Sequence, residues 1–287
     1  MSSDALILDR VGFSYRDRRY VLKNVTFSVP CGKRVAIVGA NGVGKTTLAR
    51  LLCGLLHPTE GRITVDGVDT TDSTRTFDVK RRVGLVFQDP DDQIVETKVE
   101  REIAFGLRNL GLAPDEITFR VDSILKELGM EHLKGRACHL LSAGEKQLVT
   151  LASVIVMEPR YLVLDEPTSL LDRPSRVNLL RVIRKLALQR RLGIILVTMR
   201  IEDVWFAEEV IFLKQGTVGF RGGKIEFLDY LLAQRIYTEG DFGFILDLRK
   251  ELGCVLERIR TRDDLTAELL ADAITQEMIK GRGNTCQ

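Results

Sequence analysis

The stretch GANGVGKTT, residues 39–47, decides the fold of this chain. Its residues Gly39, Gly44, Lys45 and Thr46 satisfy the pattern G-x-x-x-x-G-K-[ST] of a phosphate-binding loop. At average amino-acid usage this pattern should arise by composition in only about one chain in a hundred of this length. The stretch therefore predicts a nucleotide site, and an ordinary glycine-rich turn is the alternative.

The neighbours of this loop place it between a strand and a helix. RVAIVGA (34–40) is a compact apolar run that predicts a buried strand, and KTTLARLLCGLL (45–56) has helical spacing. Loop N–H groups and the positive end of the helix dipole suit phosphate oxygens. We expect Lys45 to reach the β- and γ-phosphates of ATP and Thr46 to coordinate Mg²⁺. The loop also contributes Asn41, Gly42 and Thr47 to the expected nucleotide site.

Two adjacent acids end a second apolar strand, YLVLDEP (161–167). Buried carboxylates need a cation or a reaction that compensates for their charge. Asp165 is expected to hold Mg²⁺, directly or through water, and Glu166 to orient or deprotonate the attacking water. A purely structural Asp-Glu turn is the alternative.

Alternating apolar and polar residues near the N-terminus predict an antiparallel β subdomain. ALILDRVGFSY and VLKNVTFSV flank the charged turn RDRR, and GRITVDGVDT (61–70) predicts a hairpin at Asp66-Gly67. RRVGLVFQ (81–88) and GIILVT (193–198) predict further strands, and EVIFLKQGTVGFRGG (209–223) predicts a closing hairpin.

Helical periodicity replaces the strand pattern between about residues 89 and 157. The whole pattern predicts an α/β fold: a core of residues 1–222 with an inserted helical subdomain. Residues 223–287 are expected to form a small C-terminal extension of mixed helix and loop.

The composition excludes several classes of protein. The 287 residues carry a net charge of only +2, so a nucleic-acid partner is not expected. Five scattered cysteines without a CxxC pair fit free thiols in a reducing compartment. The apolar run LVTLASVIVM (148–157) is about half of the ~20 residues that a membrane-spanning helix needs. We expect a chain that is soluble by itself and can dock onto a membrane protein.

The motif LSAGEKQ (141–147) completes a set of five motifs. Their order is the glycine loop, Gln88 after a predicted strand, LSAGE, LDEP and SLLD (169–172). This order resembles that of the ATP-binding cassette of ABC transporters, over residues 4–222. The resemblance implies a P-loop NTPase core of the ABC ATPase type, which hydrolyses ATP with Mg²⁺ and pairs head to tail with a second cassette, in a homodimer or a heterodimer.

The resemblance also implies roles for further residues. Tyr15 matches the aromatic residue that stacks on adenine, and a strand-end core tyrosine is the alternative. Gln88 matches the glutamine that touches Mg²⁺ and the attacking water and senses the membrane partner. Asp172 matches an aspartate that crosses the dimer interface. The signature, which faces the γ-phosphate bound by the other cassette, matches Ser142, Ala143, Gly144 and Glu145.

Ser142 and Glu145 also form the pattern S-x-x-E of a capping box, so a helix is expected to begin here. Its N-terminus can present N–H groups to an anion. The charge of Glu145 should repel phosphate unless this side chain folds back on the cap. The family commonly has Gln at this position and Gly at that of Ala143.

The stretch LVTMR (196–200) departs from the family pattern, because Met199 occupies the position of a histidine that hydrogen-bonds the γ-phosphate. Methionine has no donor. A lost hydrogen bond to a charged group costs about 1.5–3 kcal/mol, or one to two decades of turnover. We therefore expect a site that binds ATP and hydrolyses it slowly. The three histidines, expected on the surface or in loops, are His57, His132 and His139.

The segment VGLVFQDPDDQIVETKVEREIAFGLRNLGL (83–112) resembles energy-coupling factor ATPases, which drive vitamin and cobalt or nickel importers. In that family a short helix after the glutamine receives the transmembrane scaffold protein, and a separate membrane subunit binds the substrate. Asp91, Asp92 and Gln93 would begin this helix, with acids that suit the helix dipole and basic scaffold residues. A solvated acidic loop is the alternative.

FGFILDLRKELG (242–253) is similar to a C-terminal stretch that contributes to dimerisation in these ATPases. The resemblance implies a peripheral protein at the cytoplasmic face of a prokaryotic plasma membrane. Two alternatives remain, a soluble non-transport ABC ATPase and a catalytically impaired regulatory cassette in a heterodimer.

Overall fold

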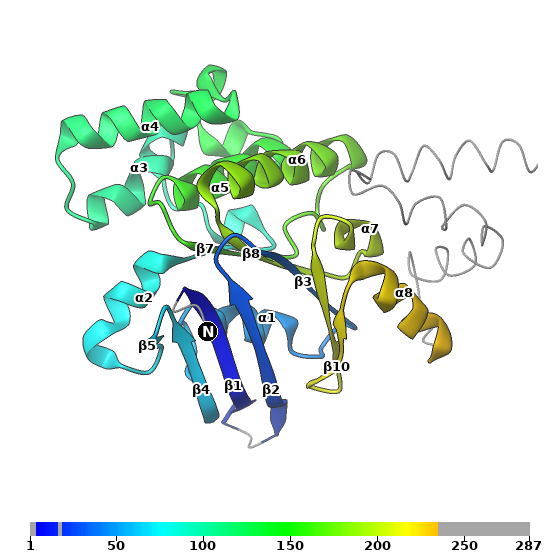
Figure 1. The fold of residues 1–287 in the computed structure, drawn as a ribbon. Helices are drawn as coiled ribbons and strands as arrows, with labels where there is room; N and C mark the ends of the chain where they lie inside the picture. Colours follow the sequence, from blue (N-terminus) through cyan, green and yellow to red (C-terminus); the bar gives the residue numbers. More distant parts are fainter. Residues whose placement is uncertain (1–3, 17–18, 235–287) are drawn as a thin grey trace, which may run out of the picture.

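The computed structural model describes residues 4–16 and 19–234, which form two β-sheets and a layer of helices (Figure 1). The antiparallel sheet contains β1 (Ala5–Ser14), β2 (Tyr20–Pro30), β4 (Glu60–Val65) and β5 (Val68–Asp69), in the order β2-β1-β4-β5. The larger sheet contains β3 (Arg34–Gly39), β6 (Val83–Val86), β7 (Tyr161–Asp165), β8 (Gly193–Thr198), β9 (Glu209–Lys214) and β10 (Thr217–Gly222). Its order is β10-β9-β3-β8-β7-β6, parallel except for β10 at the edge.

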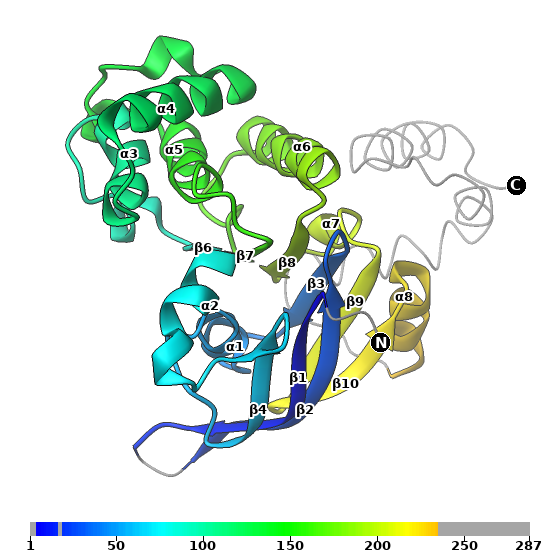
Figure 2. The same ribbon diagram turned by 60° about the vertical axis from the view of Figure 1, so that its left-hand side comes forward.

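The helices of the described residues are α1 (Lys45–Leu52), α2 (Thr76–Arg82), α3 (Val99–Asn109), α4 (Pro114–Leu128), α5 (Ala143–Ile155), α6 (Arg173–Arg190), α7 (Ile201–Val204) and α8 (Lys224–Ala233). Short 3₁₀ turns are η1 (Ser73–Arg75), η2 (Pro90–Asp92), η3 (Glu131–Leu133) and η4 (Cys138–Leu140). Helices α3 to α6 lie together on one side of the large sheet, and the antiparallel sheet lies on the other (Figures 1 and 2).

The large sheet is buried on both faces, which is typical of parallel strands. In β7, Leu162 and Leu164 pack with the layer of α3 to α6, whereas Tyr161 and Val163 pack with α1 and the antiparallel sheet. The strand β8 alternates in the same way. A third apolar cluster lies where Phe227 of α8 packs on β9. This packing fixes the carboxyl ends of β3, β7 and β8, where the predicted site residues stand.

The predicted strand–loop–helix unit is present, as are both hairpins. Asp66 and Gly67 have the positive φ angles, 49° and 78°, that a two-residue hairpin turn of this type needs. The predicted α/β fold with helices between residues 89 and 157 is confirmed. Two predicted boundaries are wrong.

The predicted helix 45–56 ends at Leu52, because the chain turns at Gly54, which has φ 65°. The predicted strand 81–88 begins only at Val83, since Arg81 and Arg82 end the short helix α2. The stretch 242–253 lies outside the described residues.

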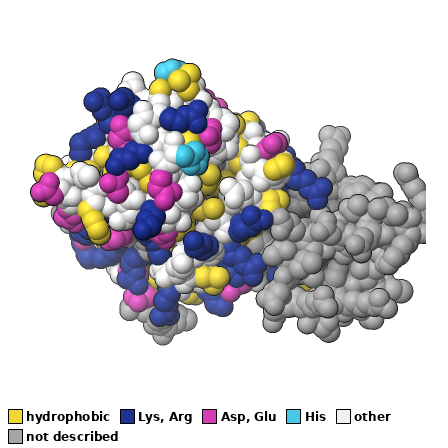
Figure 3. Space-filling model, turned by 90° about the horizontal axis from the view of Figure 1, so that it is seen from above, with side chains coloured by type: hydrophobic (Ala, Val, Ile, Leu, Met, Phe, Trp, Pro, Cys, Tyr) yellow, Lys and Arg dark blue, Asp and Glu magenta, His cyan; other side chains and the backbone are white. Residues whose placement is uncertain are grey.

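The predicted free thiols are confirmed for the three cysteines that the structure describes. Burial raises the pKa of Cys138 to about 11, so this thiol stays protonated. The three histidines are exposed, as predicted, and Figure 3 shows histidine side chains on the surface of the helical layer. Among the described residues no helix is both long enough and apolar enough to span a bilayer.

Candidate nucleotide site

The glycine loop between β3 and α1 has a backbone that only glycine adopts easily. Gly42 and Gly44 have φ angles of 75° and 107°. A Cβ atom at Gly39 would lie 2.8 Å from the carbonyl oxygen of Leu213, and one at Gly44 would lie 2.9 Å from the side chain of Leu22. The loop is thus held tightly against β2 and β9. Asn41 and Gly42 remain exposed at its rim.

Lys45 is a buried cation at the start of α1. Its Nζ donates to the carbonyl oxygens of Gly39 at 3.0 Å and Ala40 at 3.2 Å, and lies 3.3 Å from Oε1 of Glu166. A buried ammonium group needs such partners. The structure therefore brings the glycine loop and the second predicted acid into direct contact.

Asp165, the last residue of β7, lies beside the same helix start. The Thr46 hydroxyl donates to its Oδ1 at 3.3 Å. Burial raises the pKa of this carboxyl group, and the Thr46 hydrogen bond opposes that shift. A cation at this point would relieve the cost of ionising Asp165. The donor set of one carboxylate and one hydroxyl is all oxygen, as Mg²⁺ prefers. The residues present therefore fit a Mg²⁺-bound triphosphate.

Glu166 and position 199 are neighbours through the sheet. Asp165 pairs with Val197 in the register of β7 and β8, and the N–H of Glu166 donates to the carbonyl oxygen of Val197 at 2.9 Å. Glu166 itself has φ 48°, a strained angle for a residue with a side chain. Met199 follows β8 and is half-buried. Glu166 thus lies next to the end of β8, the strand that Met199 directly follows.

A buried hydrogen-bond network that the motifs do not include ties these two loops together. Asp203, in α7, accepts from the hydroxyl of Thr168 at 2.6 Å and from that of Thr198 at 3.0 Å. All three residues are buried. The Thr198 hydroxyl oxygen also accepts the N–H of Arg200 at 3.0 Å. The sequence signal was an acid four residues after Met199, too general a pattern to predict this contact.

Tyr15 lies at the end of β1, next to the glycine-loop helix. Its hydroxyl is 3.2 Å from the hydroxyl of Thr47, and its ring meets Phe13 edge-on. The side chain is 44% exposed. It is therefore not a core tyrosine, and its position leaves one side open to an adenine ring.

The predicted signature residues form a second group, at the N-terminus of α5. The capping box is present: the Glu145 N–H donates to the Ser142 hydroxyl, and the Ser142 N–H donates to Oε2 of Glu145 at 2.8 Å. These contacts, and Arg136 nearby, lower the pKa of Glu145. Glu145 thus folds back on the cap, which is the arrangement that limits its repulsion of phosphate.

Gly144 and Asp172 belong to this second group. A Cβ atom at Gly144 would lie 2.9 Å from Oγ of Ser175, so α5 and α6 approach closely here. The Asp172 carboxylate caps α6 by accepting the Ser175 N–H at 3.1 Å, and its hydrogen bonds to Ser175 lower its pKa. Asp172 therefore has a structural role within its own chain.

Gln88 is exposed between β6 and η2. Of the three residues expected to begin the scaffold-binding helix, only Asp92 has an exposed side chain that forms no hydrogen bond or ion pair among the described residues. The Asp91 carboxylate contacts Lys146, and Gln93 turns inward to accept the Phe87 N–H at 2.9 Å. The expected helix is a single 3₁₀ turn, capped by Asp89.

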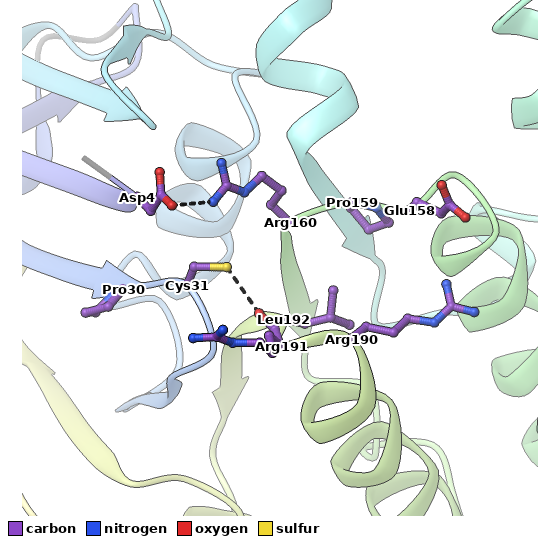
Figure 4. Close-up of a pocket in the computed structure, with 9 residues that line it drawn as sticks. All are labelled: Asp4, Pro30, Cys31, Glu158, Pro159, Arg160, Arg190, Arg191 and Leu192. Carbon is purple, nitrogen blue, oxygen red and sulfur yellow. Dashed lines mark hydrogen bonds and ion pairs between the residues drawn. The ribbon is translucent and has the colours of Figure 1, made fainter. Parts of the chain in front are cut away.

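A cavity of about 610 Å³ lies at the amino ends of the parallel strands (Figure 4), whereas the glycine loop follows the carboxyl end of β3. Its arginines Arg160 and Arg190 are paired, with Asp4 and Glu127. Within residues 4–16 and 19–234, no cluster of three or more His, Cys, Asp or Glu could hold a metal ion.

A glycine loop against a buried lysine, two acids at the next strand end, and a capped signature helix define a P-loop ATPase of the ATP-binding cassette class. The family model described as ABC transporter matches residues 22–169. The chain belongs to the ABC transporter family, among the ATP-binding subunits of energy-coupling factor importers.

The names of similar proteins agree with this assignment. A cobalt import ATP-binding protein CbiO of Syntrophus aciditrophicus is 45% identical over 207 residues, 72% of this chain and 74% of the relative. An energy-coupling factor transporter ATP-binding protein EcfA1 of Clostridium perfringens is 38% identical over 75% of this chain and 77% of the relative.

Two solved structures support the same class. CbiO1 of Clostridium perfringens, part of the ABC transporter complex cbiONQ, has a TM-score of 0.74 and 32% identity over 89% of this chain and 98% of that one. The ATP-binding cassette MJ0796, a dimer bound to ADP and Pi, has a TM-score of 0.69 and 26% identity over 76% of this chain and 98% of that one.

Proposed function

We propose that this chain drives uptake of a vitamin or a transition-metal ion by hydrolysing ATP on an energy-coupling factor type importer. The observation that carries the proposal is the convergence of Lys45, Asp165 and Glu166 on the glycine loop. The name of one relative, a cobalt import protein, supports the metal-ion part of this substrate class, and the name of another supports the energy-coupling factor type. The chain acts as a peripheral subunit at the cytoplasmic face of the membrane.

The residues around the glycine loop would each contact a different part of the bound ATP. The glycine loop and Lys45 would hold the phosphates, and Tyr15 would stack on the adenine. Thr46, Asp165 and Gln88 would hold Mg²⁺, which supplies charge neutralisation at the phosphates when bound. Asn41, Gly42 and Thr47 would complete the phosphate cradle.

Glu166 would orient and deprotonate the attacking water. To do so its carboxylate must leave Lys45, whose Nζ lies 3.3 Å from its Oε1 in the structure. The phosphates supply the replacement anion for Lys45. The proposed order is therefore binding first, which frees the base, and then proton removal from water.

The signature residues at the N-terminus of α5, together with Asp172, would contact a nucleotide that another cassette binds. Ser142 and Gly144 stand at the start of α5, where N–H groups face outward from a helix N-terminus. Glu145 would keep its contacts with the cap, and Asp172 would stand at the same interface. The dimeric state of the related cassette supports this pairing.

Met199 would make the site on this glycine loop slow, because it offers no hydrogen bond to the γ-phosphate. We propose that the chain pairs with a second, competent cassette. Met199 also favours a second candidate function, a regulatory cassette that binds ATP with little hydrolysis. In the assembled complex, Glu166→Gln in this chain alone separates the two: lost turnover supports the motor, and unchanged turnover supports the regulator.

The membrane partners can be identified directly. The full chain, tagged and purified from gently solubilised membranes, should bring down a second cassette, a transmembrane scaffold and a small substrate-binding subunit, which mass spectrometry identifies. The small subunit would point to the substrate. Recovery of this chain alone, from the soluble fraction, would contradict the importer proposal and favour a soluble ABC ATPase.

A further inference from the structure

The segment that follows β6 is held by side chains from other elements. We call residues 87–96 the docking segment, since it contains the residues proposed to meet the scaffold. Oε2 of Glu102, on α3, accepts the N–H groups of Val95 at 2.9 Å and Glu96 at 2.8 Å. Glu102 is 3% exposed, so these two hydrogen bonds compensate a buried carboxylate. The far end of the docking segment is thereby fixed to α3.

The near end of the docking segment is fixed to α5 instead. Nζ of Lys146 lies 2.6 Å and 2.8 Å from the two carboxylate oxygens of Asp91. Nε2 of Gln147 donates to the carbonyl oxygen of Phe87 at 3.2 Å. Lys146 and Gln147 directly follow Glu145, the last signature residue. Two consecutive side chains of α5 therefore reach across to two points of the docking segment, 55 and 60 residues away in sequence.

Burial distinguishes these contacts from ordinary surface pairs. Gln147 is 1% exposed, so its amide must find its partner inside the protein. The Lys146 side chain is 17% exposed and that of Asp91 65%. An exposed ion pair alone would contribute little to stability. The buried amide contact beside it adds a second attachment of α5 to the docking segment, one that water does not reach.

The other side of the α5 N-terminus is also fixed, because Gly144 packs within van der Waals reach of Ser175 on α6. The start of α5 is thus enclosed between α6 and the docking segment. We therefore expect a displacement of the docking segment to move the first turn of α5 with it.

We propose that Lys146 and Gln147 are positioning residues that make the docking segment and the first turn of α5 move as one body. A membrane partner that shifts the docking segment would then shift Ser142 and Gly144 relative to the nucleotide of the opposite cassette. The existence of a membrane partner rests on the proposed function. The coupled movement of the docking segment and α5 rests on the contacts described above.

Hydrogen exchange of the purified full chain tests the mechanical part without any membrane partner. Lys146→Met and Asp91→Asn each remove the ion pair. In either variant the amides of residues 88–94 and 143–147 should exchange about two- to fivefold faster, the range that a partly exposed ion pair allows. The double variant should be no faster than either single one, because both remove the same contact. Additive effects would overturn the proposal.

The matched control is Lys134→Met. Lys134 pairs with Asp122 at 2.5 Å, also on the helical layer, and neither side chain bonds to the docking segment. This variant should leave exchange of both peptides unchanged. An equal change in the control would mean that loss of any such ion pair loosens the layer, which would overturn the proposal.

The functional part is measured on the complex in lipid nanodiscs. We expect the stimulation of ATP hydrolysis by the co-purified membrane partners to fall about two- to fivefold in Lys146→Met and to stay unchanged in Lys134→Met. Unchanged stimulation in Lys146→Met would refute the coupling role. A wild-type chain that hydrolyses ATP but binds no membrane partner would refute the proposed function instead, and the exchange result would still decide the mechanics.

Discussion

The substitution Met199→His should raise ATP turnover, because the structure places this position beside the proposed catalytic base. Asp165 pairs with Val197 across β7 and β8, and the Glu166 N–H donates to the carbonyl oxygen of Val197. Residue 199 follows two positions later and is half-buried. An imidazole here would stand at the end of β8, which the Glu166 N–H contacts, and under the proposed mechanism its N–H would reach the terminal phosphate.

The size of the effect follows from one charge-assisted hydrogen bond. Such a bond contributes about 1.5–3 kcal/mol, and if it acts only in the transition state, kcat should rise by about 10- to 100-fold. KM for ATP should change by less than about threefold, since the ground-state phosphate contacts come from the glycine loop. Steady-state phosphate release by the purified full chain, with ATP and Mg²⁺ in excess, measures both constants.

Met199→Leu is the matched control, because it keeps the volume and offers no donor; its kcat should equal that of the wild type. Glu166→Gln in the Met199→His background should abolish the gain, which excludes a contaminating ATPase. If Met199→His turns over within twofold of the wild type, position 199 does not limit this site and the reasoning fails.

Three further predictions concern binding and stability. Asp203→Ala leaves two buried threonine hydroxyls without their acceptor, so urea unfolding should show a loss of about 2–4 kcal/mol, whereas a loss below about 1 kcal/mol would contradict the network. Tyr15→Ala should weaken ATP binding about 5- to 100-fold in calorimetry, and Tyr15→Phe less than threefold, since only the ring stacks; equal losses would refute stacking. Burial raises the pKa of Asp165, so its proton is bound more tightly in the native chain, and stability is lost as pH rises past the ordinary value of 3.8. Asp165→Asn should therefore raise the Tm of the nucleotide-free chain more at pH 7 than at pH 4; an equal gain at both would contradict the shift.

The parts of the site that depend on local sequence could be predicted from the sequence. The glycine loop needs positive φ angles at fixed positions, and the capping box joins residues three apart, so both leave a signature in a short window. The same holds for the hairpin at Asp66-Gly67. In each case neighbouring residues alone determine the geometry.

The parts of the site that depend on contacts between residues distant in sequence could not be predicted. Asp203 meets Thr168 from 35 residues away and Lys146 meets Asp91 from 55, and a single acid or lysine in a window does not indicate its partner. The helix α2 was missed for another reason: Val79 is its only buried residue, so it has no apolar stripe. Asp91 and Gln93, interpreted as docking residues, are committed to contacts within the chain.

The contact between Lys45 and Glu166 has a consequence for which anions the site accepts. Each of the two groups is the counterion of the other, so neither of them is an unpaired charge. An incoming anion must compete with the carboxylate for the ammonium group, and a monoanion too small to span the loop gains little from that exchange. A triphosphate gains the loop N–H groups in addition. Under the proposed mechanism the ion pair of Lys45 and Glu166 therefore has two effects. It disfavours binding of small anions, and it keeps the Glu166 carboxylate from acting on water before a triphosphate is bound.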